Sequence, residues 1–269
     1  MMEVLVNTKD RFMELAVLLS SLKTQSFQDW DLVLVDASQP KACWEHDTIA
    51  KVLRSLELDG HRVKAVREER PLGVGRSRNL AVKNSTDNVL VRIDDDSLLH
   101  PEYLEVLLAV HEQRKGLVGG IVPDLGTPLL WKKWKGGVFN RAWIEGDRFL
   151  IADDGGFCWA WDKGMEPPWP SHHLRSSFLF TREQWKKVKG FPTEYGKTGF
   201  REESDFTLRC LAKGYKLWTD PRAIAWHVRC GSGGVRTPEY NMLVRICDEV
   251  FQEKMMRLFK RRRKVLEYT

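Results

Sequence analysis

Three consecutive carboxylates are the strongest chemical feature of the sequence. Asp94, Asp95 and Asp96 directly follow the apolar run 89–93, whose β-branched residues are typical of a buried strand. Adjacent carboxylates repel one another unless a cation lies among them. Mg²⁺ and Mn²⁺ prefer carboxylate oxygens and often bind together with substrate phosphates. The triplet therefore indicates a metal site, with an acidic turn that caps the next helix as the alternative.

A second group of acids and one histidine are further candidates for chemistry. Glu202, Glu203 and Asp205 open a predicted helix at 202–213, where acids are common because the helix N-terminus favours negative charge. The functional alternative is a general base that deprotonates an attacking hydroxyl. His227 follows a short predicted strand, and is interpreted either as a metal ligand or as a buried histidine.

Polar side chains also follow the first two predicted strands. Thr8, Asp10 and Arg11 come after the strand at 4–6, and Asp36 ends the strand at 31–36. Such groups, feeding a helix N-terminus, can form a nucleotide pocket, whereas Thr8 or Asp10 could instead cap the helix. Asp36 can accept hydrogen bonds from a base or ribose, or cap a turn.

A glycine-containing loop at 70–79 leads into a short predicted helix. It lacks the third glycine of a dinucleotide-binding fingerprint and the Gly-Lys-Ser/Thr of a phosphate-binding loop. Arg76 and Asn79 are three residues apart on one helical face, so we expect one of them to reach toward the acid triplet. Arg78 would then point elsewhere.

The elements that must position these residues alternate between strand and helix. This alternation predicts an α/β fold with a mostly parallel central sheet and flanking helices. In such sheets, ligands bind beyond the carboxyl ends of the strands, where the polar residues would meet. The predicted strands are 4–6, 31–36, 62–66, 89–93, 116–122, 176–180, 215–218 and 223–226, and the helices are 12–22, 44–56, 75–83, 101–115, 182–187 and 202–213.

The segment 123–171 is rich in tryptophan, glycine and proline. We expect loops and short antiparallel strands laid over one end of the sheet. Clustered aromatic residues usually pack in a core, but flat aromatic faces also suit stacking on sugar rings. Trp159 and Trp161 are therefore candidate acceptor-binding residues.

The C-terminal segment from 238 onward has the pattern of one long amphipathic helix. Its predicted apolar stripe runs through Leu243, Ile246, Val250 and Phe251, and a basic run follows at 260–264. Such a helix either contacts an anionic membrane surface or packs on the domain with its basic end in solvent.

Composition excludes several classes of protein. The chain has 269 residues, of which 42% are hydrophobic, so it can form one large or two small domains. It has no apolar run long enough to span a bilayer and no signal-peptide pattern at its start. Five scattered cysteines favour the cytoplasm over a disulfide framework or a zinc site. The net charge of +6 is a weak indication of phosphate-bearing ligands and does not indicate a nucleic-acid binder.

Taken in order, these motifs resemble the family-two inverting nucleotide-sugar glycosyltransferases of GT-A fold. The order and spacing match from residue 3 to about residue 230. The motifs are Asn7-Thr8-Lys9-Asp10-Arg11, Val35-Asp36-Ala37-Ser38, Gly73-Val74-Gly75-Arg76-Ser77-Arg78-Asn79, Ile93-Asp94-Asp95-Asp96, Glu202-Glu203-Ser204-Asp205-Phe206-Thr207-Leu208-Arg209 and His227.

The resemblance implies a role for each matching position. Asp96 would be the main ligand of Mn²⁺ or Mg²⁺, helped by Asp94 and His227. Glu203 would be the general base, although a Glu stands where the family has Asp, which keeps Glu202 and Asp205 as alternatives. The remaining donor-site residues would be Thr8 and Asp36 around the base and ribose, and Asp10, Arg11, Arg76, Arg78, Asp94 and Asp95.

The resemblance also implies partners and a domain layout. The donor would be a nucleoside-diphosphate sugar, with a UDP-sugar as the first hypothesis, and the acceptor a glycan or a lipid-linked hydroxyl. Residues 1–235 would form the GT-A domain, with a nucleotide-binding half at 1–122 and an acceptor and catalytic half at 123–235. Residues 236–269 would form the C-terminal basic helix.

Two other functions remain open. A sugar-phosphate nucleotidyltransferase would normally have a glycine-rich loop after the first strand, and residues 7–11 contain no glycine. A non-catalytic module for nucleotide sugars or glycans would bind the donor without turnover, although every expected acid is present.

Overall fold

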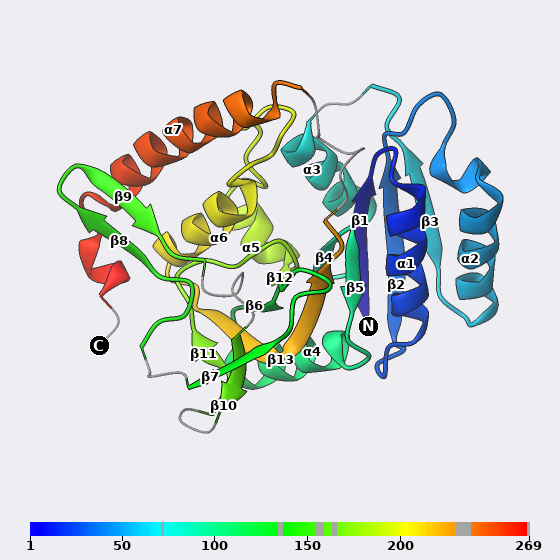
Figure 1. The fold of residues 1–269 in the computed structure, drawn as a ribbon, viewed down its shortest axis with the longest axis horizontal. Helices are drawn as coiled ribbons and strands as arrows, with labels where there is room; N and C mark the ends of the chain where they lie inside the picture. The colour runs from blue at the N-terminus through cyan, green and yellow to red at the C-terminus, as the bar shows by residue number, and fades with distance from the viewer. Residues whose placement is uncertain (71–72, 134–136, 154–158, 163–165, 230–237, 268–269) are drawn as a thin grey trace.

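The computed structural model describes residues 1–70, 73–133, 137–153, 159–162, 166–229 and 238–267. Within these ranges, one nine-stranded sheet runs through the molecule, with helices on both of its faces (Figure 1). Along the sheet the order is β11-β13-β6-β12-β4-β1-β2-β3, and β5 pairs with β13. The strands of this sheet are β1 (Met2–Thr8), β2 (Trp30–Asp36), β3 (Val63–Arg67), β4 (Val89–Asp94), β5 (Ser97–Leu99), β6 (Leu117–Ile121), β11 (Trp169–Pro170), β12 (Phe178–Thr181) and β13 (Leu217–His227). The helices are α1 (Phe12–Lys23), α2 (Asp47–Leu58), α3 (Val74–Asn84), α4 (Tyr103–Arg114), α5 (Arg182–Lys187), α6 (Glu202–Ala212) and α7 (Tyr240–Phe259).

The predicted mostly parallel sheet is confirmed. β3, β2, β1 and β4 run parallel to one another, as do β6 and β13. β12 lies antiparallel between β4 and β6 and joins the two parallel groups. The register pairs Thr8 with Asp36 and Asn7 with Asp94. The ends of β1, β2 and β4 therefore meet at one edge of the sheet, as the strand pattern predicts.

Side-chain alternation on the strands produces two cores, one on each face. Met2, Val4 and Val6 of β1 pack in a cluster that includes buried residues of α1, α2 and α4, whereas Leu5 packs with residues of α3, α6 and α7. Successive strand residues point to opposite faces, so a sheet covered on both sides needs continuous apolar strands. The apolar runs seen in the sequence meet that need.

The segment after β6 contains short strands, as expected, but only one pair is the predicted antiparallel kind. β8 (Ala142–Glu145) and β9 (Arg148–Ile151) form an antiparallel hairpin. β7 (Leu130–Lys133) and β10 (Trp159–Asp162) pair in parallel, which corrects the expectation for this pair. The backbone of Trp159 and Trp161 lies in β10.

Two further predictions are corrected. The predicted strands at 215–218 and 223–226 are one strand, β13, with an irregularity between Thr219 and Ile224. The predicted helix 44–56 begins instead as a 3₁₀ turn at Cys43–Glu45, followed by α2.

The buried stripe of α7 is rotated from the predicted one. Cys247, Phe251, Met255 and Phe259 are buried, whereas Ile246 is 48% exposed. These four residues repeat every four positions, so they form one face that packs on the second core. This matches the alternative in which the C-terminal helix packs on the domain.

None of the helices in the described ranges combines the length and hydrophobicity needed to cross a bilayer.

Candidate functional site

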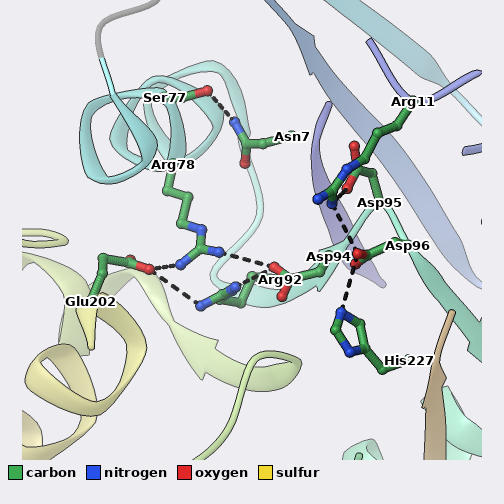
Figure 2. A network of polar contacts seen from close by, with 10 residues as sticks. All are labelled: Asn7, Arg11, Ser77, Arg78, Arg92, Asp94, Asp95, Asp96, Glu202 and His227. Carbon is green, nitrogen blue, oxygen red and sulfur yellow. Dashed lines mark hydrogen bonds and ion pairs between the residues drawn. The ribbon is translucent and has the colours of Figure 1, made fainter. Parts of the chain in front are cut away.

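The acid triplet lies where the ends of β1 and β4 meet (Figure 2). Asp94 ends β4, and Asp95 and Asp96 form the turn into β5. Because β5 separates this turn from α4, whose N-cap is Glu102, the triplet does not cap that helix. The acidic-cap alternative is therefore wrong.

Arg11 is the cation nearest to two of these acids. Its Nη1 lies 3.0 Å from Asp95 Oδ1 and 2.9 Å from Asp96 Oδ2. Thr8 Oγ1 donates to Asp95 Oδ2 at 2.8 Å. The Thr8 hydroxyl therefore binds the acid turn and does not cap α1. The N-cap residue of α1 is Arg11. Burial, together with the neighbouring Asp96, raises the pKa of Asp95 to about 7 despite the attraction of Arg11.

His227 lies on the other side of Asp96. It is the last residue of β13, pairs with Ser97 of β5, and brings its Nε2 to 3.1 Å from Asp96 Oδ2. Burial opposes protonation of this imidazole, but Asp96 more than compensates and raises the pKa of His227. Its Nδ1 lies 3.7 Å from Asp124 Oδ1. His227 therefore lies beside the acid triplet and is partly exposed, not a buried core histidine.

This pair of atoms fits two neighbouring ligands of one divalent ion. Bonds of about 2.1 Å at right angles place cis ligand atoms about 3 Å apart, close to the Asp96–His227 distance. No group of three His, Cys, Asp or Glu side chains suited to a metal is found among the described residues. Mg²⁺-type sites commonly complete their shell with water and substrate phosphates. Among the described residues, Asp96 and His227 are thus two side chains whose spacing is compatible with one divalent ion.

Asp94 belongs to a different arrangement, a network of four buried or half-buried charges. Arg78 Nη2 lies 2.9 Å and Arg92 Nη2 2.5 Å from Asp94 Oδ1. The same two arginines contact Glu202, Arg78 directly and Arg92 at 3.6 Å (Figure 2). Burial favours the neutral acid, but Arg92 and Arg78 hold the pKa of Asp94 below its usual value. Burial and the adjacent Arg92 lower the pKa of Arg78 to about 10.

This four-charge network (Arg78, Arg92, Asp94 and Glu202) connects the acid turn of β4 to the start of α6.

The helical-face prediction for α3 is wrong. Arg78 points into the site and Arg76 is exposed. Asn79 faces the segment after α5, where its amide donates to Phe191 O and accepts from Trp185 Nε1.

Two glycines at the start of α3 set this orientation, Gly73 at its N-cap and Gly75 in its first turn. A Cβ on Gly75 would lie 1.8 Å from Pro192 O, and Gly73 adopts a φ of +92° close to Gly196 O. α3 therefore packs backbone to backbone against residues 192–196, which only glycine permits. This close approach explains why the loop contains glycines. It agrees with the absence of a complete phosphate-binding pattern in the sequence.

The three acids of α6 have different surroundings. Glu202 is fully buried against Arg78 and Arg92. Asp205 is fully buried as well, and it accepts from Tyr195 Oη at 2.7 Å and pairs with Arg209 and Lys254. Glu203 is half-buried, and its charge acts on Arg78. Of the three candidates for the base, Glu203 alone is partly open to solvent.

Asp36 and Asp10 hold the loops that follow β2 and β1. Asp36 is fully buried, accepts from the backbone N–H groups of Ser38 and Cys43, and pairs with Arg67. Asp10 Oδ1 accepts from Gln39 N at 2.9 Å. The turn-capping interpretation of Asp36 therefore accounts for both of its oxygens.

Sequence reasoning missed two residues of the site, Arg92 and Asp124. Arg92 is 3% exposed and lies over the ring of Phe178, its partner in β12. A charged residue inside the apolar run 89–93 is the signal that could have identified it, because a buried guanidinium requires partners. Asp124 has no comparable local signal, since its bridge to His227 joins residues far apart in the chain.

The chain is similar to known glycosyltransferases. A model of the family described as Glycosyl transferase family 2 matches residues 3–165. An uncharacterized glycosyltransferase of Haemophilus influenzae is 27% identical over 117 residues, which are 44% of this chain and 36% of that protein. The chain thus aligns with about a third of that relative's length.

Solved structures support the same fold. A mannosyltransferase of Pyrobaculum calidifontis in complex with GDP-Man and Mn²⁺ matches with a TM-score of 0.61 at 15% identity, covering 98% of this chain and 67% of that one. GalNAc-T7 with UDP, GalNAc and Mn²⁺ gives a TM-score of 0.67 at 15% identity, covering 96% and 48%. Staphylococcus aureus TarS 1-349 with UDP-GlcNAc gives 0.58 at 16% identity, covering 91% and 65%. The fold is therefore of the GT-A type, and since the family model covers more than half of the sequence, the chain belongs to glycosyl transferase family 2.

Proposed function

We propose that the chain transfers a sugar from a nucleoside-diphosphate sugar to an acceptor hydroxyl, with inversion at the anomeric carbon. The observation that carries this proposal is the four-charge network. It links the acid turn at the end of β4 to the start of α6, where Glu203 is half-buried beside Arg78. The proposed donor edge and the half-buried carboxylate of Glu203 are thus linked through Arg78, which supports a single displacement.

Donor binding is assigned to the edge formed by β1, β2, α3 and β4. Thr8, Asp10 and Asp36 hold its loops, and Arg78 supplies positive charge. A UDP-sugar is our first hypothesis, because two of the similar structures contain UDP or UDP-GlcNAc and another contains GDP-Man. Arg76 is exposed and would act only by long-range attraction.

Asp96 and His227 would hold Mn²⁺ or Mg²⁺ at this edge. When bound, the ion supplies Lewis-acid stabilisation for the negative charge that develops on the leaving diphosphate. Asp94 contributes by holding Arg78 and Arg92, and Asp95 by holding Arg11. Of the three acids of the triplet, Asp96 is therefore the one to which we assign metal binding.

Glu203 is assigned as the general base that takes the proton from the acceptor hydroxyl as its oxygen attacks the sugar. Glu202 is neutralised by two arginines, and Asp205 is shut inside a core with Tyr195 and Lys254. A positioned base typically contributes about 10²–10⁴-fold to the rate. Glu203→Gln should therefore reduce turnover by about that factor and leave donor affinity within a few-fold.

The test is release of nucleoside diphosphate from a panel of UDP-, GDP- and dTDP-sugars, with Mn²⁺ or with EDTA. Asp96→Ala and Glu203→Gln run alongside Glu112→Gln, an exposed glutamate on α4 that serves as the matched control. Metal-dependent release from one donor, lost in both site variants and kept in the control, supports the proposal. Equal release by Glu203→Gln and wild type would refute the base assignment.

Two outcomes would favour other functions. Donor binding by thermal shift with no release, even with acceptor extracts present, would favour a non-catalytic nucleotide-sugar module. Formation of a nucleotide sugar and pyrophosphate from a nucleoside triphosphate and a sugar phosphate would favour a nucleotidyltransferase.

The acceptor side is assigned to the segment that contains β10, with Trp159 and Trp161 as the residues to substitute first. A glycan or lipid-linked acceptor is proposed. The residues at 260–264 are exposed, while the apolar face of α7 is buried in the core, so any contact with an anionic membrane would be electrostatic. Co-sedimentation with vesicles that contain anionic lipid, at low and high salt, tests that contact against neutral vesicles.

A further inference from the structure

Arg11 already neutralises part of the proposed metal site. A single atom, Arg11 Nη1, lies 3.0 Å from Asp95 Oδ1 and 2.9 Å from Asp96 Oδ2. The three side chains are 10%, 7% and 4% exposed, so water screens this contact weakly. The backbone of Arg11 is the N-cap of α1, which begins at Phe12, and its side chain is held by the two carboxylates.

The oxygen that Arg11 contacts is the one best placed for a metal. Asp96 Oδ2 accepts from Arg11 Nη1 and lies 3.1 Å from His227 Nε2. An ion bound between Asp96 and His227 would thus place two positive charges beside a guanidinium in a buried setting. Repulsion between like charges weakens the binding of such an ion, unless a ligand that binds with it adds negative charge.

We propose that Arg11 is a built-in counterion that competes with the divalent ion for Asp96. The ion would then bind weakly alone and tightly together with a nucleoside diphosphate, whose phosphates offset the added charge. The inference rests on the proposed function, because it takes the donor diphosphate as the compensating group.

The same contacts explain why the chain carries this arginine. Three adjacent acids, two of them almost fully buried, repel one another strongly without a cation. Arg11 supplies that cation before any ligand binds, and so stabilises the conformation of the turn between β4 and β5. The consequence is a lower affinity for free metal ion.

The test is titration with Mn²⁺ alone, followed by electron paramagnetic resonance of the unbound ion. Wild type, Arg11→Gln and Arg54→Gln are compared, since Arg54 is an exposed arginine on α2 and serves as the matched control. We expect Arg11→Gln to bind Mn²⁺ at least about tenfold more tightly than wild type, with Arg54→Gln unchanged. Addition of UDP should narrow this difference, because its phosphates offset the charge of Arg11.

Equal or weaker Mn²⁺ binding by a folded Arg11→Gln would overturn the proposal, as would a lack of Mn²⁺ binding by every protein with and without UDP. If Arg11→Gln does not fold, a crystal structure of wild type with Mn²⁺ and UDP decides. Separation of Arg11 Nη1 from Asp96 Oδ2 supports competition, and an intact contact beside a bound ion overturns it. Failure of the proposed function is a separate result, because it appears as missing nucleoside-diphosphate release and not in Mn²⁺ affinity.

Discussion

Substitution of Arg92 by methionine gives the sharpest test of the four-charge network. Arg92 is 3% exposed, lies 2.5 Å from Asp94 Oδ1 and 3.6 Å from Glu202, and covers the ring of Phe178. Methionine is similarly long and apolar, so it can fill the space beside Phe178 while removing the charge. The variant therefore reports on the charge more than on a cavity.

The magnitude follows from the burial of Glu202, which has no exposed surface. Removal of one partner from a buried ion pair typically costs about 3–5 kcal/mol. Arg78 still contacts both Asp94 and Glu202, so we expect a cost at or just below the lower end of that range, about 2–3 kcal/mol of unfolding free energy. The second variant, Arg92→Met with Glu202→Gln, removes one charge of each sign and should recover at least about 1 kcal/mol.

Urea denaturation of the two single variants, the double variant and wild type gives the coupling energy directly. Arg54→Met is the matched control, because its pair with Glu57 is exposed and should change stability by less than about 0.5 kcal/mol. If Arg92→Met costs under about 1 kcal/mol, or if the double variant costs the sum of the singles, the network is not energetically coupled.

Three further predictions address other parts of the site. In metal-free buffer, Asp95 has a pKa of about 7 in the folded protein and near 3.8 in the unfolded chain, so the protonated acid stabilises the fold. This stabilisation is complete below pH 3.8 and is lost as the pH rises through 7. The variant Asp95→Asn should not show this loss when melting temperatures are measured across the same pH range. Gly75→Ala should cost more than about 2 kcal/mol, because its Cβ would lie 1.8 Å from Pro192 O, whereas Lys83→Ala on the same helix should be nearly neutral in urea. Asp205→Asn should lower the melting temperature by several degrees through loss of its buried ion pairs, but a soluble preparation should retain the turnover that Glu203→Gln loses.

Local sequence was sufficient for most elements of the sheet and for the edge where they meet, but not for the single strand β13 or the start of α2. Apolar runs of strand length, separated by helical patterns, allow a parallel sheet and little else, because each strand must be buried on both faces. The carboxyl ends of parallel strands then lie at one edge, so Thr8, Asp36 and Asp94 could be brought together from sequence alone. The resemblance of the ordered motifs to family-two glycosyltransferases was confirmed by the family match.

Which side chain faces the site was decided by packing between distant segments. The phase of α3 depends on the contact of Gly75 with Pro192, and each residue along a helix turns the side chain by about 100°. Arg78 therefore faces inward and Arg76 outward, the opposite of the choice made from spacing. Likewise, the buried stripe of α7 follows the core that it covers, and this moved the stripe away from Ile246.

The sequence by itself determined the fold class, the family and the set of acids. Only the tertiary structure showed which partners each acid has, because those partners come from positions that local spacing cannot relate. Asp96 meets Arg11 and His227, which are 85 and 131 residues away in the chain. Glu202 meets Arg78 and Arg92, and Asp205 meets Lys254, whereas Glu203 is half-buried. Burial and charge partners set the chemistry of a carboxylate, and both are properties of the packed chain.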